Sequence, residues 1–370
     1  MNILLLGGTG AMGRYLAQIL SNNSENKIYI TSRQDIISQG NITYIKGDAH
    51  SDNFIQNIFQ KYGKFDAIVD FMVYKTEEFK RKVNLLTSIT NQYLFLSSAR
   101  VYANGENSPI TEETPRLLDV STDEKFLATD EYPLTKARQE DILYANSKCN
   151  YTIIRPYITY GTYRLQLGVL EKEFWLQRAL AGHTIYFSKD IAEHITTLTY
   201  GKDVAKIISL LIGNPKAYNE TVQIASNKSI CWSEILSLYE NILAKYTGTS
   251  PKIYLDDDIE SFITGYFAKY PIYYDRLYDR RFDSNKVNSI IGFNYNYLDA
   301  TKGLKNCLLE FLENPKFLSP MGGHFDAWAD KKAGNKMQLK DFPSAKDYAK
   351  YFIKRNTNAC EILARKYEIV

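Results

Sequence analysis

The first thirteen residues constrain the fold more than any other segment of the chain. An apolar run from Asn2 to Leu6 leads directly into a glycine-rich loop, G-x-x-G-x-x-G, formed by Gly7, Gly10 and Gly13. Apolar residues at helical spacing follow the loop. A strand, a glycine loop and a helix in this order form the arrangement that binds the pyrophosphate of a dinucleotide. A turn with a purely structural role is the alternative.

Each glycine has a distinct expected task in such a loop. Gly7 permits the tight turn, Gly10 lets the backbone approach the phosphates, and Gly13 allows close packing of the helix. The helix N-terminus adds amide donors and the positive end of its dipole. We expect the whole loop to contact the cofactor. The other expected contacts in it are Thr9, Ala11 and Met12.

Strand and helix patterns alternate through the N-terminal half. The further apolar runs with strand character are Lys27 to Thr31, Ile42 to Ile45, Ala67 to Phe71, Tyr93 to Leu96 and Tyr151 to Ile154. Alternation with helical segments predicts the α/β class, a Rossmann-type doubly wound parallel sheet with a smaller C-terminal α/β substrate domain.

The alternation of strand and helix patterns becomes less regular after about residue 156, which suggests domain limits. We predict a dinucleotide-binding domain over 1–160, with a returning segment near 195–225, and a mainly substrate-binding domain over 161–315. Residues 316–370 are expected to form a C-terminal helical extension, with helices near 345–354 and Cys360. Residues 249–288 read as irregular.

Composition excludes several classes of protein. The 370 residues carry a formal net charge of +3 without a long basic run, so no nucleic-acid partner is expected. No apolar run approaches the roughly 18 residues of a membrane span, and the first strand leaves no room for a signal peptide. Four widely spaced cysteines indicate free thiols in a reducing compartment. We therefore expect a cytoplasmic protein without membrane contact. The four histidines are too far apart in sequence to predict a metal site; they are His50, His183, His194 and His324.

The end of the second predicted strand bears on the choice of cofactor. The chain has Ser32 and Arg33 there, and a hydroxyl next to a guanidinium suits a 2′-phosphate. This favours NADP(H), with NAD(H) possible because Asp35 could hold a ribose; an ordinary surface arginine is the alternative. Asp48, followed by Ala49, ends the third strand, where a carboxylate can accept a hydrogen bond from adenine. A turn or helix-capping aspartate is the other interpretation.

A Y-x-x-x-K pattern supplies the candidate chemistry. Tyr132 and Lys136 begin a predicted helix, and a spacing of four places them on one face. An ammonium beside a phenol stabilises the phenolate, which makes a tyrosine useful as a general acid or base near neutrality. Ser98 follows the fifth strand, where parallel sheets bind ligands, and could hydrogen-bond a substrate oxygen. Two serines capping a loop would be the structural interpretation.

Further short motifs follow in a specific order. The chain resembles an extended short-chain dehydrogenase/reductase of the NAD-dependent epimerase/dehydratase family, which acts on nucleotide sugars, over roughly residues 1–313. Besides the glycine loop and Y-x-x-x-K, the resemblance rests on Asp48, Phe71-Met72-Val73-Tyr74-Lys75, Ser98-Ala99-Arg100-Val101-Tyr102, Arg155-Pro156 with Tyr160-Gly161, and Leu198-Thr199-Tyr200-Gly201-Lys202-Asp203-Val204-Ala205.

The resemblance implies roles for particular residues. Ser98, Tyr132 and Lys136 would form a catalytic triad, with Lys136 also holding the nicotinamide ribose. Phe71, Met72 and Lys75 would lie along the cofactor, with Lys75 near its phosphates. The implied substrate-binding residues are Tyr157, His194, Arg276, Arg280 and Arg281. For the arginines a solvated salt-bridge cluster is the alternative, and for His194 a structural role. The resemblance also implies a homodimer.

Two departures from the family pattern narrow the expected function. Ala99 and Arg100 replace the Asp-Glu pair of sugar-nucleotide 4,6-dehydratases, so the acid and base for eliminating water are missing. Ile158 replaces an asparagine that contacts substrate phosphate. We predict an NADP(H)-dependent reductase of a nucleotide-linked keto sugar, acting at C4 with Tyr132 as proton donor. The alternatives are a nucleotide-sugar 4-epimerase with tightly bound NAD, and a non-catalytic nucleotide- or RNA-binding protein.

Overall fold

The computed structural model of the chain describes residues 1–104, 109–145 and 149–366. These residues divide into two compact units. The first unit comprises Met1–Thr159, Thr197–Lys228 and Arg281–Leu298; the second comprises Tyr160–Thr196, Ser229–Arg280 and Asp299–Val370. None of the described helices combines the length and the apolar content that a membrane crossing requires.

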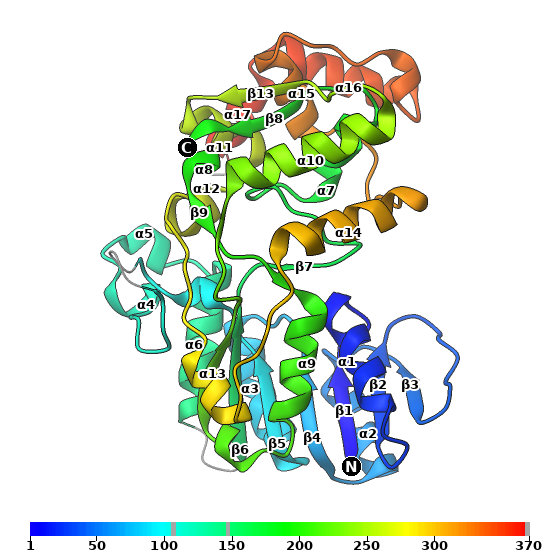
Figure 1. Cartoon of the computed structure of the whole chain (residues 1–370), viewed down its shortest axis with the longest axis vertical. Coiled ribbons are helices and arrows are strands. Elements are labelled where there is room, and N and C mark those ends of the chain that lie inside the picture. The colour runs from blue at the N-terminus through cyan, green and yellow to red at the C-terminus, as the bar shows by residue number, and fades with distance from the viewer. Residues whose placement is uncertain (105–108, 146–148, 367–370) are drawn as a thin grey trace. The chain divides into compact units, whose positions relative to one another are not determined.

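A seven-stranded sheet forms the centre of the first unit, in the order β11-β6-β5-β4-β1-β2-β3 (Figure 1). All neighbouring strands in it run parallel. The strands are β1 (Asn2–Leu6), β2 (Lys27–Ser32), β3 (Ile42–Lys46), β4 (Phe65–Asp70), β5 (Thr90–Leu96), β6 (Asn150–Pro156) and β11 (Glu220–Ile224). The sheet confirms the predicted Rossmann-type fold. The strand order reverses between β1 and β4, and ligands of such sheets bind beyond the carboxyl ends of the strands at that point.

Helices cover both faces of this sheet because its strands are apolar on both sides. One core cluster joins the sheet to α1, α9 and α13; the opposite cluster joins it to α2, α3 and α6 (Figure 1). The helical elements of the first unit are α1 (Ala11–Ser21), α2 (Asp52–Tyr62), α3 (Thr76–Ser88), η1 (Ala99–Val101), α4 (Leu117–Val120), α5 (Glu124–Leu127), α6 (Tyr132–Tyr144), α9 (Gly201–Leu211), η2 (Pro215–Ala217) and α13 (Asn285–Ile291).

The second unit is mainly helical. Its helices are α7 (Lys172–Leu180), α8 (Lys189–Glu193), α10 (Trp232–Thr247), α11 (Ile259–Tyr266), α12 (Lys269–Pro271), η3 (Ile272–Arg276), α14 (Ala300–Glu313), α15 (His324–Lys332), η4 (Leu339–Asp341), α16 (Ala345–Asn356) and α17 (Ala359–Lys366). The short strands outside the large sheet are β7 (Thr159–Tyr160), β8 (Ile185–Ser188), β9 (Ile195–Thr196), β10 (Thr199–Tyr200), β12 (Ile230–Cys231) and β13 (Ile253–Asp256).

Two segments differ from the sequence-based expectation. Residues 249–288 contain β13, α11, α12, η3 and the start of α13, although they read as irregular. These elements are too short for a hydrophobic period to emerge from the sequence. The C-terminal extension also contains α15, which the sequence did not predict. A buried ion cluster holds α15 in place, because Arg178 of α7 pairs with Asp326 at 2.8 Å and with Asp330 at 2.6 Å.

Candidate functional site

The glycine loop after β1 has a shape that larger residues would disrupt. Gly7 adopts a positive φ of +67°, and a Cβ there would lie 2.9 Å from the sulfur of Met72. A Cβ at Gly13 would lie 2.4 Å from the carbonyl oxygen of Gly8. At Gly10, which precedes the first turn of α1, a Cβ would meet nothing within 4 Å. The loop therefore packs tightly at both ends and leaves open space over the helix N-terminus, where a diphosphate can bind.

A cavity of about 320 Å³ lies against this loop, within the first unit. Its walls come from the ends of β1, β2, β3 and β4, as expected for the point where the strand order reverses. It is lined by Gly7, Thr9, Gly10, Thr31, Ser32, Arg33, Gly47, Asp48, Ala49, His50, Phe71, Met72 and Val73. Most of the residues predicted to bind the cofactor thus share one cavity. Ala11, Met12 and Gly13 lie in the first turn of α1, and Lys75 is exposed just before α3.

A second hollow, of about 740 Å³, shares Thr9, Ser32 and Arg33 with the first. It is also lined by Arg14, so two guanidinium groups border it. Arg33 is exposed, while the Nε of Arg14 donates to the carbonyl of Thr9 at 2.7 Å. Arg14 was not among the predicted cofactor contacts, although it directly follows Gly13 in the sequence. An anion bound here would meet two cations and the hydroxyl of Ser32.

The two acidic residues near the cavity, Asp35 and Asp48, each form a contact with a nearby residue. Asp35 forms an exposed ion pair with Lys46 at 3.2 Å. Asp48 lines the cavity, and its Oδ1 accepts a hydrogen bond from the backbone N–H of His50 at 3.0 Å. Asp48 is therefore a turn residue that is also available to a ligand through its second oxygen. Lys82, only 1% exposed, fixes this loop by donating to the carbonyl of His50 at 3.0 Å.

Helix α6 carries the Y-x-x-x-K pair. It begins at Tyr132, and a proline in its first turn favours a helix start at that point. The Nζ of Lys136 lies 6.0 Å from the centre of the Tyr132 ring and 4.5 Å from that of Phe95. Lys136 is 2% exposed, and burial lowers the pKa of its ammonium to about 8. A cation thus lies beside the phenol, as the sequence predicted.

Ser98 follows β5 on the segment that packs against this helix. Its side chain caps η1, because its Oγ accepts a hydrogen bond from the backbone N–H of Arg100 at 3.2 Å. The Arg100 guanidinium lies 5.6 Å from the centre of the Tyr132 ring and 3.6 Å from the carboxylate of Glu131. The three predicted catalytic residues therefore lie on neighbouring elements of the first unit, and two cations, Arg100 and Lys136, lie near the Tyr132 ring.

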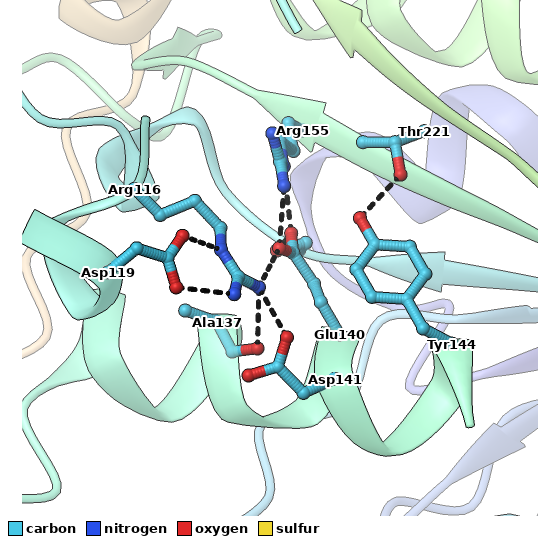
Figure 2. A network of polar contacts seen from close by, with 9 residues as sticks. Arg116, Asp119, Ala137, Glu140, Asp141, Tyr144, Arg155 and Thr221 are labelled. Carbon is cyan, nitrogen blue, oxygen red and sulfur yellow. Dashed lines mark hydrogen bonds and ion pairs between the residues drawn. The ribbon is translucent and has the colours of Figure 1, made fainter. Parts of the chain in front are cut away.

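A buried polar network fixes the catalytic helix to the sheet. Figure 2 shows Glu140, one turn after Lys136, held by two hydrogen bonds from Arg155 of β6 at 2.9 and 2.7 Å and by Arg116 at 3.3 Å. Ser97 also donates to Glu140, at 2.5 Å. This network joins the end of β5, β6 and α6, and so sets the position of Ser98 relative to α6. Glu140 was not predicted from the sequence, where its helical spacing from Lys136 was the one signal.

Of the predicted substrate-binding residues, Tyr157 and Arg281 belong to the first unit. Tyr157 is 1% exposed and packs against Phe282, with ring centres 4.7 Å apart, whereas Arg281 is exposed. His194 belongs to the second unit, where its Nδ1 lies 3.5 Å from Asp279. Among the residues that the structure describes, no group of three or more His, Cys, Asp or Glu side chains is placed to hold a metal ion.

Arg276 and Arg280 come together in the second unit on the buried carboxylate of Asp275. The Nε of Arg280 lies 3.0 Å from Asp275, and Arg276 also pairs with it. Backbone carbonyls of Gly168 and Tyr274 accept further hydrogen bonds from the two guanidinium groups. The cluster is buried, in contrast to the solvated cluster that the sequence analysis considered as an alternative. The π-helix η3 brings Asp275 and Arg276 to this position.

Comparison with protein families agrees with this geometry. Residues 3–225 match the model of the NAD dependent epimerase/dehydratase family. The chain belongs to this family and is an enzyme of the extended short-chain dehydrogenase/reductase type. Membership sets aside the alternative of a non-catalytic nucleotide- or RNA-binding protein. No curated protein matches the chain in sequence.

Solved structures resemble the chain over most of its length. A dTDP-glucose 4,6-dehydratase from Bacillus anthracis, solved with NAD, is 17% identical with a TM-score of 0.64, covering 85% of this chain and 97% of its own. A UDP-glucuronic acid 4-epimerase from Bacillus cereus, solved with UDP-glucuronic acid and NAD, is 15% identical with a TM-score of 0.63, covering 85% and 99%. An epimerase from Methanothermobacter thermautotrophicus is 15% identical with a TM-score of 0.64, covering 85% and 92%. At identities this low, the structural similarity shows that the fold is shared and does not by itself assign a function.

Proposed function

We propose that the protein is an NADP(H)-dependent reductase of a nucleotide-linked keto sugar. The observation that carries the proposal is the conjunction of the glycine-loop cavity with a buried Lys136 beside Tyr132 in one compact unit. The reduced cofactor, when bound, supplies the hydride that reduces a ring carbonyl, which we assign to C4 of the sugar. The protein supplies alignment and a proton.

Each member of the triad has a separate task in this reduction. Tyr132 donates its phenolic proton to the carbonyl oxygen as that oxygen gains negative charge. The ammonium of Lys136 stabilises the phenolate that Tyr132 becomes, and we expect it also to hold the nicotinamide ribose. Ser98 orients the same substrate oxygen through its hydroxyl. General acid catalysis of this kind contributes about 10²–10⁴-fold to a rate.

Arg14 and Arg33 support the choice of NADP(H). Both border the hollow beside the cofactor cavity, and a 2′-phosphate there would be bound by two guanidinium groups. The acidic residue expected of an NAD site is Asp35, which pairs with Lys46. Arg100 next to Tyr132 also argues against a 4,6-dehydratase, because the resemblance implies an acidic pair at the positions of Ala99 and Arg100.

We keep a 4-epimerase with tightly bound NAD as the second candidate. The observation that favours it is that fold relatives include a UDP-glucuronic acid 4-epimerase solved with NAD. An epimerase uses the same triad but retains its cofactor through the reaction. The substrate in both cases is a nucleotide sugar, with Tyr157, His194, Arg276, Arg280 and Arg281 as the proposed contacts, and we propose a homodimer.

Nucleotide released from the purified protein on denaturation distinguishes the two candidates. A reductase exchanges its cofactor, so we expect substoichiometric nucleotide and saturable binding of added NADPH, tighter than that of NADH. Stoichiometric NAD⁺ that stays bound through gel filtration would overturn the reductase proposal and support a 4-epimerase that retains its cofactor.

A further inference from the structure

A carboxylate is buried at the end of β4, directly below the cofactor cavity. Asp70 is 0% exposed, and the residues that follow it, Phe71 and Met72, line the cavity. Its Oδ2 accepts hydrogen bonds from the hydroxyl groups of Tyr93 at 2.6 Å and Tyr74 at 3.0 Å, and its Oδ1 accepts one from the backbone N–H of Met72 at 2.9 Å. Three donors directed at one carboxylate stabilise its ionised form.

The ammonium of Lys136, on α6, lies over the ring of Phe95, the neighbour of Asp70 in the sheet. Asp70 and Phe95 are register partners in neighbouring parallel strands, and the Nζ of Lys136 lies 4.5 Å from the Phe95 ring centre. Both charged side chains are almost completely removed from solvent. In such a low-dielectric setting the attraction between unlike charges is several times stronger than in water.

The effect of each group on the other follows from burial and charge. Burial raises the pKa of the Asp70 carboxyl, whereas the ammonium of Lys136 and the hydrogen bonds from the two tyrosines oppose that rise. Burial likewise lowers the pKa of Lys136 to about 8, and the attraction of Asp70 and Glu140 opposes that fall. Without Asp70 the ammonium would lose its proton at lower pH.

Other charged groups around the pair are already compensated. Glu140 shares helix α6 with Lys136 but is held by two hydrogen bonds from Arg155 and by Arg116. Arg100 lies on the Tyr132 ring and pairs with Glu131. The titratable groups that face Asp70 and Lys136 are therefore Tyr93 of β5, Tyr74 of the loop after β4, and Tyr132 and Glu140 of α6.

We propose that Asp70 is the buried counter-ion of Lys136 and acts as a positioning residue: it keeps the ammonium charged and close to Tyr132. The effect of this pairing on cofactor binding rests on the proposed function, whereas the pairing itself does not.

A double-mutant cycle tests the pairing without any ligand. Urea unfolding at pH 7 is compared for wild type, Asp70→Asn, Lys136→Met and the double variant. Each single change leaves one buried charge without its partner. The folding equilibrium constant of the double variant should therefore be at least about tenfold higher than the value expected from adding the stability losses of the two single variants. Asp66→Asn with Lys136→Met is the matched control, because Asp66 lies at the other end of β4 and binds the N–H of Asn2; its losses should add. Additive losses for Asp70 and Lys136 would overturn the proposal.

The pH dependence of NADPH affinity tests the functional consequence. In wild type the affinity should fall as pH rises through about 8, where Lys136 loses its proton. Asp70→Asn should shift this fall in affinity by at least about one pH unit toward acid. Lys136→Met should abolish the fall. Tyr93→Phe keeps the Asp70 carboxylate, so the fall should stay at nearly the same pH. An unshifted fall in Asp70→Asn overturns this role of Asp70. If wild type bound no dinucleotide at all, the proposed function would fail, while the double-mutant cycle would still decide the pairing.

Discussion

The two arginine clusters of the molecule contain the same residue type in opposite settings. Arg33, with Arg14, borders an open hollow beside the glycine loop of the first unit. Arg276 and Arg280 of the second unit are 6% and 1% exposed and turn onto Asp275. An exposed cation at a cavity costs little to maintain and is available to a ligand. A buried one contributes to folding, because removing it leaves a buried charge unpaired. The sequence and its family resemblance assigned Arg33, Arg276 and Arg280 to anion binding, and the burial of the last two adds a role in folding.

Replacing Tyr132 should give the largest effect, and it should be confined to chemistry. Tyr132→Phe removes the proton donor while keeping the ring that Arg100 and Lys136 approach. We expect kcat for keto-sugar reduction to fall about 10²–10⁴-fold, with NADPH affinity and unfolding midpoint close to wild type. Steady-state kinetics and fluorescence titration measure both. A variant that retained full turnover would remove Tyr132 from the mechanism.

The buried cluster of the second unit should respond in stability instead. Arg280→Met leaves Asp275 with one partner fewer in a buried site, so we expect a loss of about 3–5 kcal/mol in the free energy of unfolding. Arg281→Met is the matched control, because this neighbouring arginine is exposed, and its loss should stay within about 0.5 kcal/mol. Urea denaturation compares the two. Equal, small losses would show that Arg280 has no structural role and would favour its role in gripping substrate.

Lys136 is a buried cation of the first unit, and its titration should appear in the stability of the fold. Its pKa of about 8 in the folded protein lies below the ordinary value of about 10.4. Between these values the unfolded chain binds more protons, so stability should rise with pH by up to about 1.4 kcal/mol per unit. The difference between wild-type and Lys136→Met unfolding curves from pH 7 to 10 isolates this contribution. Parallel curves would contradict it.

The exposed cluster should affect only the choice of cofactor. Arg33→Ser should weaken NADPH binding about 10–100-fold, the equivalent of one charge-assisted contact, and leave NADH nearly unchanged. Lys46→Ser is the matched control, because it removes a nearby exposed cation that pairs with Asp35. Its NADPH affinity should change less than about threefold. If both variants lost NADPH affinity equally, general surface charge rather than a 2′-phosphate contact would explain the loss.

Sequence reasoning reached the parts of the site that local spacing determines. The loop of Gly7, Gly10 and Gly13 and the pair Tyr132 and Lys136 each lie within one short segment, so their spacing predicted where they lie, while their catalytic and binding roles stay predictions. The alternating strands likewise predicted the sheet that the structure shows.

Residues whose partners lie far away in the chain could not be predicted from the sequence. Glu140 meets Arg155 only across α6 and β6, and the pairing that we propose for Asp70 and Lys136 requires β4, β5 and α6 to pack together. Arg178 pairs with carboxylates about 150 positions later, which hold an extension that reads as polar sequence. Such buried ion pairs depend on tertiary contacts, so no helical or strand periodicity in the sequence predicts them.

The oxidation of NADPH, followed by its absorbance with a panel of nucleotide sugars and their 4-keto forms, tests the central claim most directly. We predict that wild type oxidises NADPH with at least one 4-keto form, faster than NADH, and forms the corresponding nucleotide sugar with a hydroxyl group at C4. Absence of oxidation with every keto form, together with interconversion of C4 epimers by an enzyme that retains NAD⁺, would contradict the account.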